Sequence, residues 1–161
     1  MDKYEFRGRS KQTGRWLFGD LIQIGKCVFI APFDVFWQDF IDRRETNPIH
    51  TPYNVYEVFP STVGQFTGIT DKDGTKIYEG DIVECVSWND FFTNPDTGEV
   101  MEPFRRKVYI ELRDGGFKMI EKMPEPWEDH IWDIITFSGD ITIVGNMADN
   151  PELVEPKKLT V

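Results

Sequence analysis

The chain has 161 residues, a formal net charge of −10 at pH 7 and 14% aromatic residues, which fit one folded domain, or a small barrel with an N-terminal elaboration, and argue against disorder. The excess of acid lies in the second part, because residues 1–60 carry eight acidic and eight basic side chains and residues 61–161 carry twenty acidic and ten basic. This balance opposes binding to nucleic acid or anionic membranes, since both require basic side chains beside phosphate groups.

The N-terminal part predicts a β-hairpin. Residues 15–24 have the composition of a strand with a kink at Gly19-Asp20, and residues 27–31 have that of a returning strand. Between them, Gly25-Lys26 fits a two-residue turn with Gly at its first central position.

An aromatic segment follows in residues 33–44, and its conformation is left open. Apolar side chains recur there at helical spacing, which favours a short amphipathic helix: Phe33, Phe36, Trp37, Phe40 and Ile41. They would form either a binding face or, as we favour, a surface packed on the barrel or on a neighbouring subunit. We place the hairpin and this segment in an N-terminal region of residues 1–57, which precedes a region of residues 58–161 or is continuous with it.

The run of residues 58–86 is the densest in turn and strand signals: VFPSTVGQFTGITDKDGTKIYEGDIVECV. Glycines at four places in this run are expected to place bends, and two aspartates are expected to secure turns: Gly64, Gly68, Gly74 and Gly80, with Asp73 and Asp81. From residue 81 the chain alternates as a strand with apolar residues on both faces, which predicts a strand buried on both sides. The candidates for the core are Ile77, Ile82 and Val83.

A calcium loop is the alternative interpretation of the turn in this run. A loop that began at Asp71 would need Gly at its sixth position and Glu at its twelfth. Lys76 and Ile82 stand at those places, so the sequence favours a simple turn.

The second part of the chain contains the clearest hairpin. Residues 107–112 alternate between apolar and polar side chains, Asp114-Gly115-Gly116 forms a turn, and residues 117–120 return. Residues 89–103 precede this hairpin and are rich in turn signals, so we expect a long exposed loop there.

The C-terminal third predicts less regular structure. Residues 127–137 mix aromatic and acidic side chains and are open between a short helix and an irregular strap. A final strand is expected after Gly139-Asp140. Asn150 is expected to cap a short helical turn that has Pro151 at its first position.

The two cysteines, Cys27 and Cys85, both lie in apolar alternating segments, so we expect buried free thiols in a reducing compartment. A disulfide between them stays open, because two cysteines without a local framework are weak evidence for one. The first seven residues lack the apolar core of a signal peptide, and no stretch approaches transmembrane length. We therefore expect a protein of the cytoplasm.

Three blocks of sequence resemble the YopX family of bacteriophage and prophage proteins. The first block runs from Tyr4-Glu5-Phe6-Arg7 through Arg15-Trp16-Leu17-Phe18 to Gly19-Asp20-Leu21. The second runs from Thr62-Val63-Gly64-Gln65-Phe66-Thr67-Gly68 through Asp73-Gly74 to Ile77-Tyr78-Glu79-Gly80-Asp81-Ile82-Val83. The third runs from Ile143-Val144-Gly145-Asn146 to Asn150-Pro151-Glu152-Leu153. Local departures stand at Gly8-Arg9 and Met147-Ala148.

This resemblance implies a mainly β fold, of the β-rich α+β kind, with an SH3-like small β-barrel in the C-terminal part, and a phage origin. The residues themselves add an N-terminal hairpin and one or two short helices to this expected fold. With a phage origin, the expected location is the cytoplasm of the bacterial host. The family pattern offers no catalytic residue to carry over and no established activity.

The residues themselves offer little chemistry. His130 with Asp129 and Asp133 is the nearest approach to a metal or acid–base cluster, and on a helix His130 and Asp133 would share a face. A metal site normally needs three or four ligands at characteristic spacing, so we expect neither a metal nor a cofactor. The chain has no nucleophile elbow and no phosphate loop, and we expect no catalytic residue. The basic cluster Arg105 to Lys107 is interpreted as protection of a strand edge.

The sequence therefore favours a non-enzymatic accessory protein that binds itself, as a homo-oligomer, or a host or phage protein. The candidate binding surface combines an exposed corner with the aromatic residues beyond it: Tyr78, Glu79, Gly80, Asp81, Trp88, Phe91 and Phe92. One alternative is a nucleic-acid-binding barrel in which Trp88, Phe91 and Phe92 act with the Arg105–Lys107 cluster. Another is an acidic decoy that binds a basic host protein.

Overall fold

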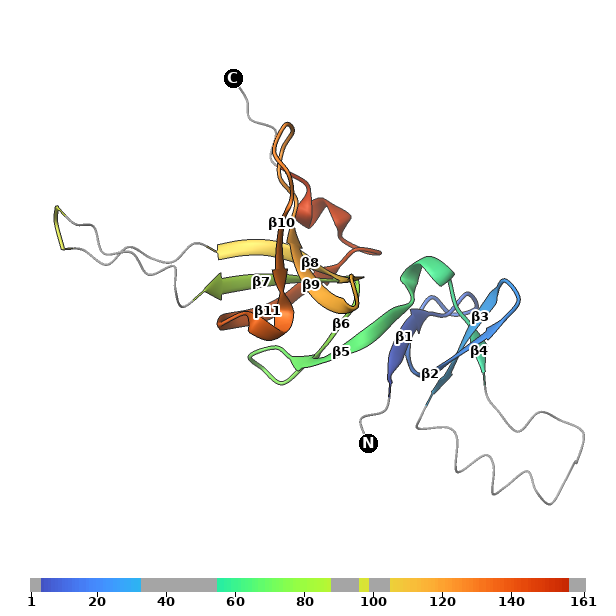
Figure 1. Ribbon diagram of the computed structural model, residues 1–161. Coiled ribbons are helices and arrows are strands. Elements are labelled where there is room, and N and C mark those ends of the chain that lie inside the picture. The colour runs from blue at the N-terminus through green and yellow to red at the C-terminus, as the bar shows by residue number, and fades with distance from the viewer. Residues whose placement is uncertain (1–3, 33–54, 88–95, 99–104, 157–161) are drawn as a thin grey trace, which may run out of the picture. The chain divides into compact units, whose positions relative to one another are not determined.

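The computed structural model describes residues 4–32, 55–87, 96–98 and 105–156 (Figure 1). These residues are 57% strand and 9% helical, which confirms the mainly β fold. The strands are β1 Phe6–Arg9, β2 Trp16–Ile24, β3 Cys27–Pro32, β4 Tyr56–Glu57, β5 Gly64–Thr70, β6 Lys76–Tyr78, β7 Asp81–Ser87, β8 Arg105–Arg113, β9 Gly116–Glu121, β10 His130–Asp133 and β11 Gly139–Asn146. Helical content in the described ranges is confined to the short 3₁₀ turns η2 Pro60–Thr62, η4 Ile134–Thr136 and η5 Pro151–Val154.

Two compact units divide the chain, residues 1–66 and residues 67–161, so that β5 begins in the first unit and ends in the second. Each unit is described by itself below. The division after residue 57 that the sequence suggests stays a prediction, because compactness in space does not establish where an independently folding region ends.

The first unit is an antiparallel sheet in which β1 lies between β2 and β5, with β3 and β4 beyond β2. The predicted hairpin is confirmed: β2 and β3 pair from Ile24↔Cys27 to Gly19↔Pro32, and Gly25 turns the chain with a φ of 60°. Cys27 is exposed beside this turn. The expectation of a buried thiol was wrong there, because the residue begins β3 directly after the exposed turn of the hairpin.

Close approach of the backbone explains why glycine occupies two strand positions in the first unit. A Cβ built on Gly19 would lie 2.0 Å from the carbonyl oxygen of Ala31, and one built on Gly8 would lie 2.9 Å from a methyl group of Val58. Val58 and Ile30 are both fully buried. The sheet therefore packs tightly on itself at these places, and a side chain has no room there.

The second unit contains a five-stranded antiparallel sheet in the order β10-β9-β8-β7-β11 (Figure 1). Its β8–β9 hairpin is the one predicted from the sequence, since Arg113 pairs with Gly116 across a two-residue loop. Both loop residues have positive φ, 52° for Asp114 and 78° for Gly115, as an Asp-Gly hairpin turn requires.

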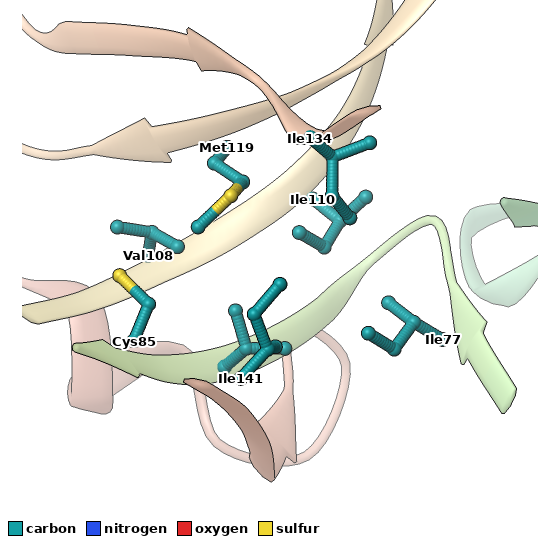
Figure 2. Packing of buried hydrophobic residues seen from close by; sticks show 8 residues of the cluster. Ile77, Cys85, Val108, Ile110, Met119, Ile134 and Ile141 are labelled. Carbon is teal, nitrogen blue, oxygen red and sulfur yellow. The ribbon is translucent and has the colours of Figure 1, made fainter. Parts of the chain in front are cut away.

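The hydrophobic core of the second unit lies on one face of this sheet (Figure 2). It contains Ile77, Val83, Cys85, Val108, Ile110, Met119, Ile134 and Ile141. Of the predicted core residues, Ile77 and Val83 lie in this cluster, and Ile82 is fully buried on the opposite face of β7. The prediction of burial on both faces of this strand is confirmed at its start, and Cys85 is a buried free thiol as expected.

The described residues form two antiparallel sheets and no closed barrel, so the barrel that the resemblance implies is not confirmed. Residues 127–137, left open between helix and strap, contain β10 and η4. Asn150 precedes the predicted turn η5, but its side chain makes no capping hydrogen bond. The aromatic segment 33–44 lies outside the described residues.

Candidate binding surface

Gly80, in the predicted corner, connects three parts of the second unit. Its N–H donates a hydrogen bond to the carbonyl oxygen of Ile110 at 2.8 Å, and its own carbonyl oxygen accepts one from the N–H of Met147 at 2.7 Å. Its φ of 82° is in the region that favours glycine. The corner therefore holds the start of β7 against β8 and against the end of β11.

The side chains beside Gly80 are largely buried. Tyr78 is 3% exposed and Asp81 is 2% exposed, and the Asp81 carboxylate accepts a hydrogen bond from the Tyr78 N–H at 2.8 Å. Glu79 and Gly80 are half-buried, and a Glu79 carboxylate oxygen accepts from the N–H of Leu112 at 3.3 Å. A partner could reach only Glu79 and Gly80 directly, and a binding role for this corner stays a prediction.

The other predicted site residues, Trp88, Phe91 and Phe92, lie outside the described residues. The predicted binding surface therefore combined two groups of residues, and the structure describes only one of them, the corner at residues 78–81. Its residues act mainly on one another and on the backbone of β8 and β11.

The blocks that carry the family resemblance contact one another within each unit. In the first unit, the N–H of Phe66 donates to the carbonyl oxygen of Glu5 at 2.7 Å, and the N–H of Arg9 donates to the Thr62 hydroxyl at 2.9 Å. These bonds join the first block to the start of the second. In the second unit, the bond from Met147 to Gly80 joins the region of the third block to the end of the second. The second block therefore contacts the first block in one unit and the region of the third block in the other unit.

The turn after β5 is held by Asp71 and not, as predicted, by Asp73. The Asp71 carboxylate accepts hydrogen bonds from the N–H groups of Asp73 at 2.9 Å and Thr75 at 2.8 Å. The Asp73 side chain points instead to Lys72, with which it forms an exposed ion pair at 2.8 Å. The position of Asp71 at the start of the turn explains the difference, since a carboxylate there can accept from backbone N–H groups further along.

These bonds also set the pKa of Asp71. Burial acts to raise the pKa of this carboxyl group, but the backbone N–H donors and the positive charge of Lys72 outweigh burial and lower the pKa below its ordinary value of 3.8. The Asp71 carboxylate is thus a structural anion of the β5–β6 turn.

The residues of the His130 cluster lie on or beside a strand, not a helix. Residues three apart on a strand point to opposite faces, so His130 and Asp133 do not share one. Each of the three residues pairs with a different residue of β9 or of the segment directly after it: His130 with Glu121 at 3.4 Å, Asp129 with Lys122 at 2.9 Å, and Asp133 with Lys118. No group of three potential metal ligands occurs among the described residues. These charged side chains accompany the backbone pairing that joins β10 to β9.

The basic cluster begins β8, and at these three residues the strand pairs with β7 alone among the described strands. Pairing with β9 starts only at Tyr109, so the interpretation of the cluster as edge protection stays a prediction. Arg105 forms an ion pair with Glu84 of β7 at 3.0 Å, and the Arg106 guanidinium lies 5.6 Å from the centre of the Trp132 ring. Arg105 is thus engaged by β7, and Arg106 by a ring of β10.

Three of the exposed large apolar side chains of the second unit lie in one stretch of chain that the sequence had left open, while Leu112 and Val144 are exposed elsewhere. We call residues 124–135 the edge segment, because they comprise the turn before β10, the edge strand β10 itself and the start of η4. Trp127 is 66% exposed, Ile131 is 45% exposed and Ile135 is 79% exposed. The run of aromatic and acidic residues was visible in the sequence, but its place at a sheet edge was not.

The fold defines a β protein with two antiparallel sheets. The prominent residues that the structure describes make structural contacts and form no catalytic constellation. The family model described as YopX protein matches residues 5–155, and the chain belongs to the YopX family. No curated protein sequence matches the chain. The chain is also similar to a solved structure titled "Crystal structure of protein EF1440 from Enterococcus faecalis", with 18% identity, a TM-score of 0.44 and coverage of 96% of this chain and 100% of that chain. A likeness at this level does not establish a shared fold.

Proposed function

We propose that this protein is a non-enzymatic, phage-encoded accessory protein that acts by binding another protein in the cytoplasm of the bacterial host. The observation that carries this proposal is the exposure of Trp127, Ile131 and Ile135 along one edge segment. Large apolar side chains gathered at a surface mark sites where proteins associate, and Trp is enriched among the residues that dominate binding energy.

Further support comes from what the remaining prominent residues do. The Gly80 corner and Asp71 hold the backbone, and charged residues of β9 and β10, such as Lys118 and Asp133, pair with one another. Each of these groups has a structural partner, whereas the apolar side chains of the edge segment face solvent. In the described ranges no helix is long and apolar enough to cross a membrane.

The five-stranded sheet fits a small barrel of the SH3-like kind, and we include this in the proposal. Two observations support it. The last strand, β11, returns to pair with β7, the first strand of the sheet, and the single turn η4 lies between β10 and β11. A bulge between Ile143 and Gly145 increases the local twist of β11, which favours curvature toward closure.

A copurification experiment with a matched variant tests the binding function. Tagged wild-type protein, the variant Trp127→Ser and the control variant Val144→Ser, whose apolar side chain is 38% exposed on β11, are each expressed in a bacterial host. We expect a host or phage protein to copurify with wild type and with Val144→Ser and to be depleted about tenfold with Trp127→Ser. Turnover in a broad hydrolase and nucleotide screen would contradict the proposal, as would identical sets of copurified proteins for all three.

A further inference from the structure

The two edges of the five-stranded sheet differ in what covers them. At one edge, the carbonyl oxygen of Ile141 in β11 accepts a hydrogen bond from the N–H of Lys72 at 2.9 Å, and the strand is interrupted by its bulge. At the other edge, β10 pairs with β9 alone within the described ranges. An edge strand presents backbone N–H and C=O groups with which another extended chain can pair. Among the described residues, β10 is therefore the edge that is open to an added strand.

The charge beside this edge selects the kind of chain that would pair there. Trp127 lies between Glu125 and Glu128, which are both exposed and make no ion pair within the described part of the chain. Asp129 and Asp133, by contrast, are engaged by lysines. The uncompensated negative charge therefore flanks an exposed Trp ring, and Trp is the aromatic side chain that attracts ammonium and guanidinium groups most strongly.

We propose that the edge segment binds an extended polypeptide that carries alternating basic and apolar side chains, as a strand added to β10. This inference rests on the proposed binding function and names its partner. A Lys or Arg of the bound chain stacks on Trp127 beside Glu125 and Glu128, and apolar side chains contact Ile131 and Ile135. Backbone hydrogen bonds to β10 fix the direction and register of the bound chain, and the alternate side chains give specificity.

Because β10 is short, the test must be able to detect weak binding. A four-residue strand offers few backbone bonds, so the interaction depends on the side-chain contacts at Trp127 and Ile131 and is weak for a short peptide. The probe is the blocked peptide Lys-Val-Lys-Val-Lys, added to the full ¹⁵N-labelled chain up to about millimolar concentration. Amide chemical shifts report which backbone groups are bound.

The peptide is compared with two matched peptides. One has the same sequence with both valines N-methylated, which keeps its charge and removes backbone donors, and the other is Glu-Val-Glu-Val-Glu. We expect saturable shifts at the amides of β10 and at the Trp127 indole with the Lys-Val peptide, an affinity about tenfold lower for the methylated peptide, and no shifts with the Glu-Val peptide.

Variants of the chain locate the site. Trp127→Ala and Ile131→Lys are each expected to weaken the Lys-Val peptide about tenfold, and Val144→Lys on the covered edge is expected to leave its affinity unchanged. If Ile131→Lys fails to fold, Trp127→Ala still decides the matter, because Trp127 lies on an exposed turn.

Three results would overturn the proposal of an added basic strand. Each of them can be told apart from a failure of the proposed binding function. Equal affinity for the methylated peptide would leave binding in place but exclude an added strand. No shifts with the Lys-Val peptide would exclude a basic partner, while the copurification experiment decides separately whether any partner exists. Shifts at β10 that grow with protein concentration, without peptide, would assign this edge to a second copy of the chain.

Discussion

At the residue scale, the contacts of Asp81 explain why an acid stands at the start of β7. Its carboxylate is 2% exposed and accepts the N–H of Tyr78 at 2.8 Å. A buried N–H that loses its acceptor costs about 1–3 kcal/mol. We therefore expect Asp81→Ala to lower the free energy of unfolding by about that amount, measured by urea denaturation.

Asp73→Ala is the matched control for this substitution. The Asp73 side chain is 62% exposed and pairs with Lys72 at the surface. Exposed ion pairs contribute little, so the control is expected to change the free energy of unfolding by less than about 0.5 kcal/mol. Equal losses for the two variants would show that Asp81 is not the structural acid of this run.

The sequence located the turns at this scale but not always the residue that holds them. It predicted that Asp73 secures the turn after β5, whereas Asp71 does so. Both aspartates lie in the same turn, and composition alone does not say whose carboxylate faces the backbone. The exposure of Cys27 was missed for a similar reason, because alternation does not show that a strand end lies open to solvent.

At the element scale, the pairing of β2 with β3 depends on the absence of a side chain at Gly19. A Cβ there would lie 2.0 Å from the Ala31 carbonyl oxygen, which belongs to the backbone and cannot move aside alone. We expect Gly19→Ala to cost about 3 kcal/mol or more in unfolding free energy, or to prevent folding of the first unit.

Gly14→Ala separates this close approach from the general cost of replacing a glycine. Gly14 has a φ of 70° and open space around its Cα, so only conformational strain of about 1–2 kcal/mol is expected. Urea denaturation monitored by tryptophan fluorescence compares the two variants. Similar losses would mean that the strands separate readily to admit a methyl group.

The β5–β6 turn predicts a pH dependence. The folded protein holds the pKa of Asp71 below its ordinary value, because backbone donors outweigh burial, so the unfolded chain takes up the proton first as the pH falls. The contribution of Asp71 is therefore present above about pH 4 and is lost below it. We expect Asp71→Asn to show a shallower loss of stability between about pH 4 and pH 2 than wild type, measured by urea midpoints. Parallel pH profiles would contradict this.

Hairpins were the elements that the sequence predicted well. Both are local, and their turns are marked by Gly25 and by Asp114-Gly115. The strand character of β10 was not resolved, because it depends on pairing with β9, which periodicity within residues 127–137 does not show. The sequence therefore left this segment open between a short helix and a strap.

At the scale of the whole molecule, the order of strands in each sheet is what the sequence could not supply. The sequence did not show that β10 is an edge strand, and this position is what reveals a surface at Trp127 and Ile131. Many residues that carry the family resemblance make hydrogen bonds that fix the backbone, as Gly80 and Asp81 do, and these residues were recognisable in the sequence. The exposed edge segment lies outside the three resembling blocks, so the resemblance did not point to it.

We propose that the corner at residues 78–81 is structural and that the edge segment is the binding surface. The dissociation constant of the Lys-Val-Lys-Val-Lys peptide for Glu79→Ala and for Trp127→Ala, with wild type as reference, separates the two roles. We expect an unchanged constant for Glu79→Ala and one about tenfold higher for Trp127→Ala. A weakened Glu79→Ala beside an unaffected Trp127→Ala would contradict it.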